Sequence, residues 1–183
     1  AKRNAMIHHL LSPILDLLYP RLCLACNSDL PPPSEILCLQ CQYELPVTQH
    51  WLQPENAFTE IFWGRVPIET GAALYYFSKA GRVQHLVHQL KYENKPQIGW
   101  RLGQRLGWEL SKQEHFYTVE AIVPVPLHPQ KLSTRGYNQA EEFGKGISTV
   151  LECPLWPNAL VRTENSTSQT RKSRQDRALN VQQ

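Results

Sequence analysis

The sequence lacks any apolar run of about 18 residues, the length that a membrane-spanning helix requires. Its apolar stretch MIHHLLSPILDLLYP is interrupted by Pro13 and is not followed by a small-residue cleavage site, so a secretory signal peptide is not expected. Internal repeats are also absent, and a net charge of +3 permits an anionic partner without requiring one. We therefore expect a cytoplasmic protein with no transmembrane segment.

Cysteine is scarce but concentrated, because four of the five cysteines lie in CLACNSDLPPPSEILCLQC, at Cys23, Cys26, Cys38 and Cys41. Each C-x2-C pair can form a tight knuckle, and two knuckles supply the four thiolates of a tetrahedral zinc site. The insert between the pairs contains three consecutive prolines, which favour a stiff turn that brings the knuckles together. Four cysteine ligands leave no open coordination position, so the expected zinc is structural.

The four cysteines also allow other interpretations. Two disulfides would need an oxidising compartment, and no secretory signal accompanies them. An iron–sulfur cluster could use the same four ligands, and the sequence does not exclude it. The fifth cysteine, Cys153, precedes Pro154 and is expected to be packed rather than reactive.

The hydrophobic pattern after residue 67 predicts alternating strands and helices. Apolar residues at helical spacing predict three amphipathic helices, beginning near Val83, near Ile98 and at Asn138, the last with Glu141 in a capping-box position. Short apolar runs predict strands at 68–77, 120–126 and 155–162. This alternation favours an α/β fold with a mostly parallel sheet. The expected organisation is an N-terminal helix and zinc ribbon at 6–46, a connector at 47–67 and the α/β domain at 68–183.

The segment AIVPVPLHPQKLSTRGYNQAEEFG places basic residues between a predicted buried strand and a helix start. Lys131 and Arg135 precede Gly136, and the helix is expected to begin at Asn138. Ligands of open α/β sheets bind beyond the carboxyl ends of strands, and the amides of a helix N-terminus attract anions. The pattern predicts a phosphate or pyrophosphate site, with a solvated loop carrying two surface cations as the alternative.

Five pieces of the sequence, in this order, closely resemble the ComF (ComFC/GntX) family: ILDLLYPRLCLAC, CLQC, HQLKYENK, VPVPLHPQKLSTRGYNQA and SQTRKSRQDRALNV. Proteins of this family are competence-associated and pair an N-terminal zinc ribbon with a phosphoribosyltransferase-like domain. The resemblance implies a role in natural transformation and DNA uptake, with action on incoming single-stranded DNA at the inner face of the membrane. It also implies the competence helicase and DNA-processing proteins as partners. An active phosphoribosyltransferase in nucleotide salvage is the alternative that it leaves open.

The resemblance further implies residues that bind phosphoribosyl pyrophosphate (PRPP), with magnesium as a cofactor if the site is intact. These residues are Lys91, Tyr92, Lys131, Arg135, Gly136, Asn138, Gln139, Arg171, Arg174 and Arg177. Lys91 could equally serve the dipole of the helix that it ends. The basic segment from Arg171 to Arg177 could close over pyrophosphate, neutralise nucleic-acid phosphates or be a solvated tail. The PRPP loop of the family is expected after Val181, beyond the end of this sequence.

Overall fold

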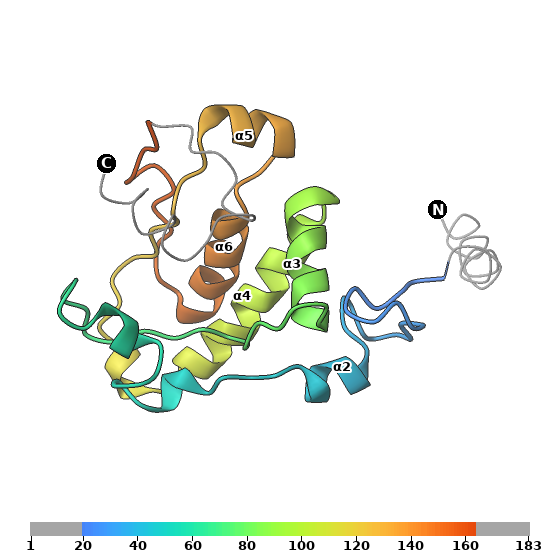
Figure 1. Cartoon of the computed structure of the whole chain (residues 1–183), viewed down its shortest axis with the longest axis horizontal. Coiled ribbons are helices and arrows are strands. Elements are labelled where there is room, and N and C mark those ends of the chain that lie inside the picture. The colour runs from blue at the N-terminus through green and yellow to red at the C-terminus, as the bar shows by residue number, and fades with distance from the viewer. Residues whose placement is uncertain (1–19, 164–183) are drawn as a thin grey trace, which may run out of the picture.

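The computed structural model describes residues 20–163, and within this range the regular elements are helical (Figure 1). In chain order they are α2 (Leu39–Glu44), the 3₁₀ turns η1 (His50–Leu52) and η2 (Thr59–Phe62), α3 (Arg82–Tyr92), α4 (Pro96–Leu110), η3 (Glu114–Phe116), α5 (Pro129–Arg135) and α6 (Gln139–Leu151). The cysteine-containing segment 20–46 lies at one end of the molecule beside α3, and α4 and α6 form its centre (Figure 1). Among these described residues, no helix has the length and apolar character needed to cross a membrane. The N-terminal helix predicted within 6–46 falls outside the described range.

The three amphipathic helices predicted from the sequence are confirmed as α3, α4 and α6. Pro96 occupies the first turn of α4, where its missing N–H costs no helical hydrogen bond. Asn138 caps α6, its side-chain oxygen accepting a 3.0 Å hydrogen bond from the backbone N–H of Ala140. Glu141, predicted as the reciprocal partner in a capping box, forms a 3.0 Å ion pair with Lys145 one turn later. The helix start was therefore predicted correctly from the cap residue.

Helices α4 and α6 cross at a contact lined by glycine. A methyl group on Gly103 would lie 2.0 Å from the carbonyl oxygen of Phe143, and one on Gly146 would lie 2.1 Å from that of Trp100. Both distances are far shorter than van der Waals contact, so only a hydrogen atom fits at either position. The two helix backbones therefore touch directly, and this contact holds the centre of the molecule together.

The predicted mostly parallel sheet is wrong. The only β-pairing within residues 20–163 consists of isolated bridges. These join Leu22 to Asp29, Val47 to Tyr75 and, in parallel, Ile122 to Leu155. The last bridge joins the predicted strands 120–126 and 155–162 through two hydrogen bonds of 2.9 Å, one donated by the N–H of Ile122 and one accepted by its carbonyl. A phosphoribosyltransferase-like α/β sheet is therefore not part of the described structure.

Proline explains why the parallel pairing does not extend. Pro124 and Pro126 follow Ile122 at alternate positions, and Pro154 directly precedes the partner residue Leu155. Proline has no N–H to donate to a neighbouring strand, so a ladder through these positions loses its regular hydrogen bonds. The apolar run AIVPVP indicated a buried strand, but its composition permits only one bridge.

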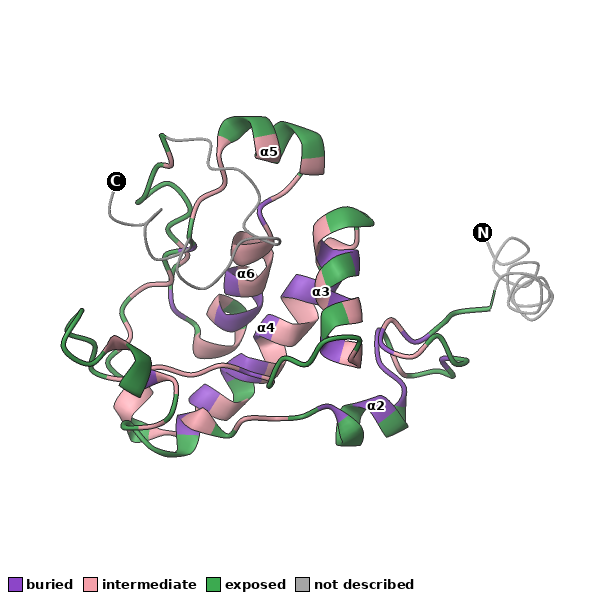
Figure 2. Ribbon diagram, viewed as in Figure 1, coloured by how far each residue is buried: buried purple, intermediate pink, exposed green. Residues whose placement is uncertain are grey.

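The buried core is shared between the cysteine-containing segment and helices α3 and α4. One cluster of buried side chains consists of Cys23, Ala25, Leu30, Ile36, Leu37, Cys38, Cys41 and Leu45 together with Val83, Leu86, Leu90 and Ile98. Leu86 and Ile98 are completely buried. Figure 2 shows buried residues on α3 and α4 and along the cysteine-containing segment. The division into domains at residue 46 stays a prediction, and apolar packing runs across that position.

Candidate metal centre and anion-binding edge

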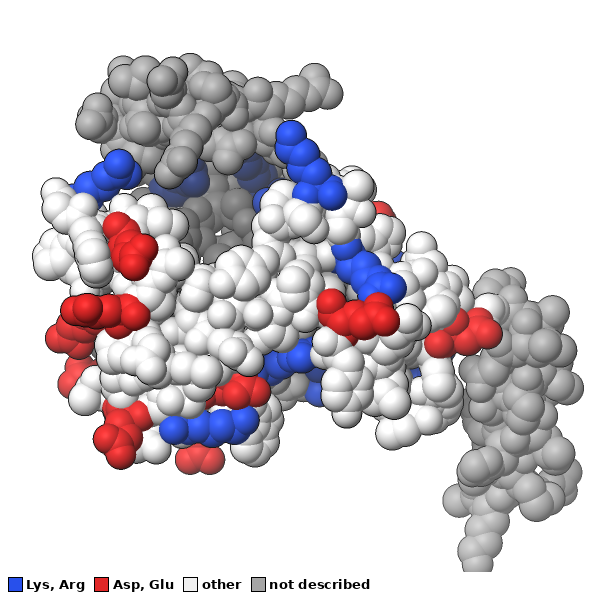
Figure 3. All heavy atoms as spheres, turned by 60° about the horizontal axis from the view of Figure 1, so that its bottom comes forward, with Lys and Arg blue, Asp and Glu red and all other residues white. Residues whose placement is uncertain are grey.

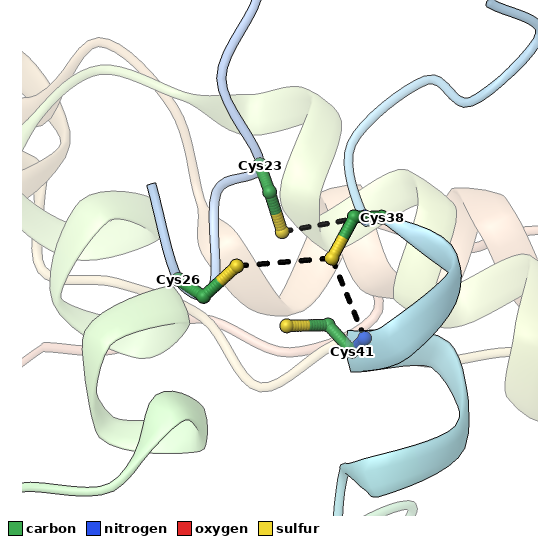
Figure 4. Close-up of side chains that lie close together, drawn as sticks. All are labelled: Cys23, Cys26, Cys38 and Cys41. Carbon is green, nitrogen blue, oxygen red and sulfur yellow. Dashed lines mark hydrogen bonds between the residues drawn. The ribbon is translucent and has the colours of Figure 1, made fainter. Parts of the chain in front are cut away.

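The four sulfur atoms of Cys23, Cys26, Cys38 and Cys41 converge (Figure 4). All four lie within 4.8 Å of one another, and those of Cys26 and Cys38 are 3.7 Å apart. The cysteines are free, and this separation is far longer than the disulfide bond length of about 2.05 Å. A tetrahedral site with metal–sulfur bonds of about 2.3 Å has sulfurs about 3.8 Å apart, so the group fits a zinc ion.

Backbone N–H groups point at two of these sulfurs. The N–H of Cys38 donates to the sulfur of Cys23 at 3.3 Å, and the N–H of Cys41 donates to the sulfur of Cys38 at 3.5 Å. Cys38 is also the N-cap of α2, so the second knuckle is built on the first turn of that helix. Hydrogen bonds of this kind orient metal ligands and stabilise negative charge on sulfur. The sequence spacing thus produces a preorganised set of four ligands.

The environment of each thiol sets how readily it becomes a thiolate, the form that binds metal. The Ser28 hydroxyl, 3.0 Å from the sulfur of Cys26, and the Ser28 backbone lower the pKa of Cys26 to about 6. The N–H of Cys41 lowers the pKa of Cys38. Burial has the opposite effect on Cys41 and raises its pKa. A bound cation would lower this pKa again, because its charge stabilises the thiolate. Cys26 and Cys38 are therefore more readily ionised than Cys41.

Polar contacts attach the cysteine-containing segment to the helices. Two ion pairs cross the contact, Arg82 with Glu44 and Arg101 with Glu35, and Arg105 donates a 2.9 Å hydrogen bond to the carbonyl of Gln42. The fourth link comes from the buried side chain of Gln89 on α3, which donates a 2.6 Å hydrogen bond to the carbonyl of Leu24. The candidate metal centre is thus held against α3 and α4 by both apolar and polar contacts.

Three of the residues predicted to bind an anion lie together at the junction of α3, α5 and α6. We call this candidate site the anion-binding edge and define it by Tyr92, Arg135 and Gln139. The guanidinium of Arg135 lies over the Tyr92 ring, 5.8 Å from its centre, and donates a hydrogen bond to the side-chain oxygen of Gln139. A guanidinium carries five donor hydrogens, so this bond leaves donors that an anion could use. Tyr92 is 58% exposed, which places an aromatic surface beside a positive charge.

Tyr137 supports this edge, although it is not among the residues predicted from the sequence. Its hydroxyl donates a hydrogen bond to the carbonyl of Leu90 near the end of α3, which ties the α5–α6 turn to α3. Burial raises the pKa of Tyr137, partly offset by the positive charge of Arg135. The sequence feature that could have indicated Tyr137 is its position between Gly136 and Asn138, two residues that were predicted to bind the ligand.

The structure places the other predicted ligand residues around this edge without joining all of them to it. Lys91 is half-buried in the last turn of α3, and Lys131 lies one turn before Arg135 on α5. Gly136 ends α5 with φ of 83°, a left-handed conformation that glycine adopts without strain. Asn138 is buried, and its amide also donates a 3.0 Å hydrogen bond to the carbonyl of Val125. Arg171, Arg174 and Arg177 lie outside the described residues.

Acidic side chains near the anion-binding edge are themselves paired. Lys145 lies 2.7 Å from the carboxylate of Glu142, and Glu93 is within 3.7 Å of Lys95 and 3.2 Å of His88. These pairs reduce the repulsion that the carboxylates would exert on an anion. On the face drawn in Figure 3, basic side chains gather toward the upper border, whereas acidic ones concentrate on the left and lower parts.

Comparison with known proteins found one curated relative, Competence protein F of Haemophilus influenzae. The two sequences are 31% identical over 99 residues, which cover 52% of this chain and 43% of the relative. The match confirms the resemblance to the ComF family that the sequence pieces predicted, over less than half of the relative's length. No protein-family model matches the chain, and no solved structure matches it significantly.

Proposed function

We propose that this protein is a competence protein of DNA uptake, with a structural zinc ion at the four cysteines and a surface at the anion-binding edge that binds single-stranded DNA. The observation that carries the competence role is the similarity to Competence protein F. The name of that relative concerns competence, whereas binding of zinc and of DNA is proposed from the site chemistry described above.

The zinc part rests on the ligand set. Four sulfurs from two C-x2-C knuckles lie at separations that suit one tetrahedral ion, and N–H groups already support two of them. Zinc bound by four thiolates is closed to substrate, so its contribution is to hold residues 23–41 in shape. Cys23, Cys26, Cys38 and Cys41 are therefore assigned as zinc ligands and not as catalytic groups.

The DNA part rests on the pairing of an exposed aromatic ring with a cation at the anion-binding edge. Single-stranded nucleic acid is bound where basic groups follow the phosphates and aromatic side chains stack on bases. Arg135 would contact a phosphate and Tyr92 a base, with Lys91 and Lys131 on the adjoining helix turns adding positive charge. Nothing in this arrangement selects a base, so weak sequence preference is expected.

A salt titration tests the DNA part. Binding of a fluorescent single-stranded oligonucleotide, followed by anisotropy, should weaken with salt at a slope of about −0.7 per phosphate neutralised. Arg135→Gln should therefore reduce the slope by about 0.7, because one phosphate contact is lost. Arg65→Gln is the matched control, since Arg65 is exposed on the turn after η2 and away from the three defining residues.

The same pair of variants separates DNA from PRPP as the ligand. Calorimetry with PRPP and magnesium, run beside the anisotropy titration, shows which ligand depends on Arg135. If Arg135→Gln leaves DNA binding intact and removes PRPP binding, the edge is a PRPP site and the DNA proposal is refuted. Equal effects of Arg135→Gln and Arg65→Gln on DNA binding would likewise remove the edge from the proposal.

A further inference from the structure

The side chain of Gln89 is buried between helix α3 and the cysteine-containing segment. It is 1% exposed, and both ends of its amide are used. The nitrogen donates a 2.6 Å hydrogen bond to the carbonyl of Leu24, and the oxygen accepts a 2.6 Å hydrogen bond from the ammonium of Lys95. Leu24 lies between Cys23 and Cys26, so the amide of Gln89 contacts the backbone of the first knuckle directly.

The peptide groups of Leu24 connect three parts of the site. Its N–H donates a 2.9 Å hydrogen bond to the carbonyl of Ile36, two residues before Cys38. Its carbonyl is held by Gln89, which is 65 residues away in the chain. The N–H of Leu24 therefore joins the first knuckle to the residues just before the second knuckle. The carbonyl of Leu24 anchors this pair of knuckles to α3.

Apolar packing does not account for glutamine at this position. Leu86 and Leu90 lie on the same face of α3 and belong to the shared apolar cluster. A third apolar side chain would continue that face, whereas a buried amide is costly unless its hydrogen bonds are made. The carbonyl of Leu24 and the ammonium of Lys95 provide those bonds. Glutamine at position 89 is therefore explained by its hydrogen bond to the first knuckle.

We propose that Gln89 is a positioning residue for the metal centre. By holding the carbonyl of Leu24, it sets the turn that presents the thiolates of Cys23 and Cys26, and Lys95 keeps its amide in the required orientation. Affinity for the metal therefore depends on a residue that does not touch the metal. The inference rests on the proposed binding of zinc, and its test separates the two.

The alternative is that Gln89 contributes only to general stability. In that case a substitution would lower the stability of the metal-free and metal-loaded protein equally. A positioning residue behaves differently, because weaker binding to the folded state also reduces the stabilisation that metal confers. Metal affinity and the metal-dependent rise in melting temperature are therefore the informative measurements.

The experiment uses the full chain, reduced and stripped of metal. Zinc affinity is measured by competition with a chromophoric chelator, and cobalt absorption reports whether four thiolates still bind at saturation. Gln89→Met keeps the side-chain length and removes both hydrogen bonds. Its zinc affinity should fall at least about tenfold, within the range typical for residues that support metal ligands. Its cobalt spectrum at saturation should match that of the wild type, because no ligand has been lost.

Two further variants keep the result decisive. Gln97→Met is the control, since Gln97 is exposed in the first turn of α4, and its zinc affinity should equal that of the wild type. Gln89→Glu keeps the shape and the bond to Lys95 but loses the donor to Leu24, and we expect the same loss of affinity. It provides the measurement if Gln89→Met does not fold.

The outcomes are distinguishable. Wild-type affinity in Gln89→Met or Gln89→Glu overturns the positioning role, as does an equal loss in Gln97→Met. A smaller melting-temperature rise on zinc addition, together with weaker binding, supports the role. If the wild-type chain itself binds neither zinc nor cobalt, the proposed metal function fails first, and that failure is visible before any variant is compared.

Discussion

Replacing Gly103 with alanine tests whether α4 and α6 pack backbone against backbone. The added methyl would lie 2.0 Å from the carbonyl oxygen of Phe143 and 3.1 Å from the Cα of Gly146. Both neighbours are main-chain atoms of a helix, so no side chain can rotate to make room. The helices must separate, and the contact that they share is lost in part.

The magnitude follows from two opposing terms. Alanine in place of glycine inside a helix is intrinsically favourable by about 0.8–1.0 kcal/mol. Overpacking of a close contact costs about 1–3 kcal/mol, and the rigid neighbour places Gly103 at the upper end. We therefore expect Gly103→Ala to lower the free energy of unfolding by about 2 kcal/mol, or about 4–8 °C in melting temperature for a chain of this size.

Gly107→Ala is the matched control on the same helix. Its methyl would lie 3.0 Å from the Cβ of Val150 and 3.3 Å from the Cα of Ile147, so a shift of a few tenths of an ångström suffices. The helix-propensity gain then offsets most of the cost, and near wild-type stability is expected. Urea denaturation followed by circular dichroism measures both variants.

A double variant sharpens the test. Gly103 and Gly146 face each other, so the separation forced by one methyl also makes room for the other. The combined loss in Gly103→Ala/Gly146→Ala should therefore be smaller than the sum of the single losses. A Gly103→Ala variant as stable as the wild type, or strictly additive losses, would refute the close crossing.

Two other substitutions probe the metal centre and the connector. A chelator should lower the melting temperature of the wild type, because bound metal stabilises the folded state, and should leave that of Cys38→Ser unchanged. Thermal denaturation measures both, and an equal effect of the chelator on the two proteins would contradict this. Asn56→Ala should cost about 2–3 kcal/mol in urea denaturation. The two amide hydrogens of Asn56 are shared among the carbonyls of His50, Gln53 and Gly71, and its side-chain oxygen accepts from the N–H groups of Phe58 and Thr59. The exposed Asn158→Ala should be neutral, and a neutral Asn56→Ala would show that these bonds do not order the connector.

Local patterns predicted the three longest helices and the clustering of the four cysteines. Apolar residues recur at helical spacing within α3, around Leu86, and within α4, from Ile98 to Leu106. Asn138 and Pro96 are residue types with strong preferences for helix starts. The paired C-x2-C spacing likewise depends on short-range chain geometry. In each of these cases the deciding interactions lie within a few residues of one another, where a single sequence carries enough information.

The errors concern long-range pairing. The run at 120–126 is predicted as a strand from its apolar residues, but the effect of Pro124 and Pro126 on pairing depends on the register with Leu155. The leucines of α4 alone account for its amphipathic pattern, so nothing local indicates a packing role for its glycines. That role depends on the backbone of Phe143, which lies on another helix. The bond between Gln89 and Leu24 joins residues far apart in the chain, so no local pattern could indicate it.

The shared core described above has a consequence for how the protein would accumulate in a cell. Because Cys23, Cys38 and Cys41 pack in the same cluster as Leu86 and Ile98, a newly made chain without metal would expose the apolar side of α3 as well as its own knuckles. Surfaces of this kind are what chaperones and proteases act on. If zinc binds as proposed, the supply of zinc during synthesis would then limit the steady-state amount of the folded protein.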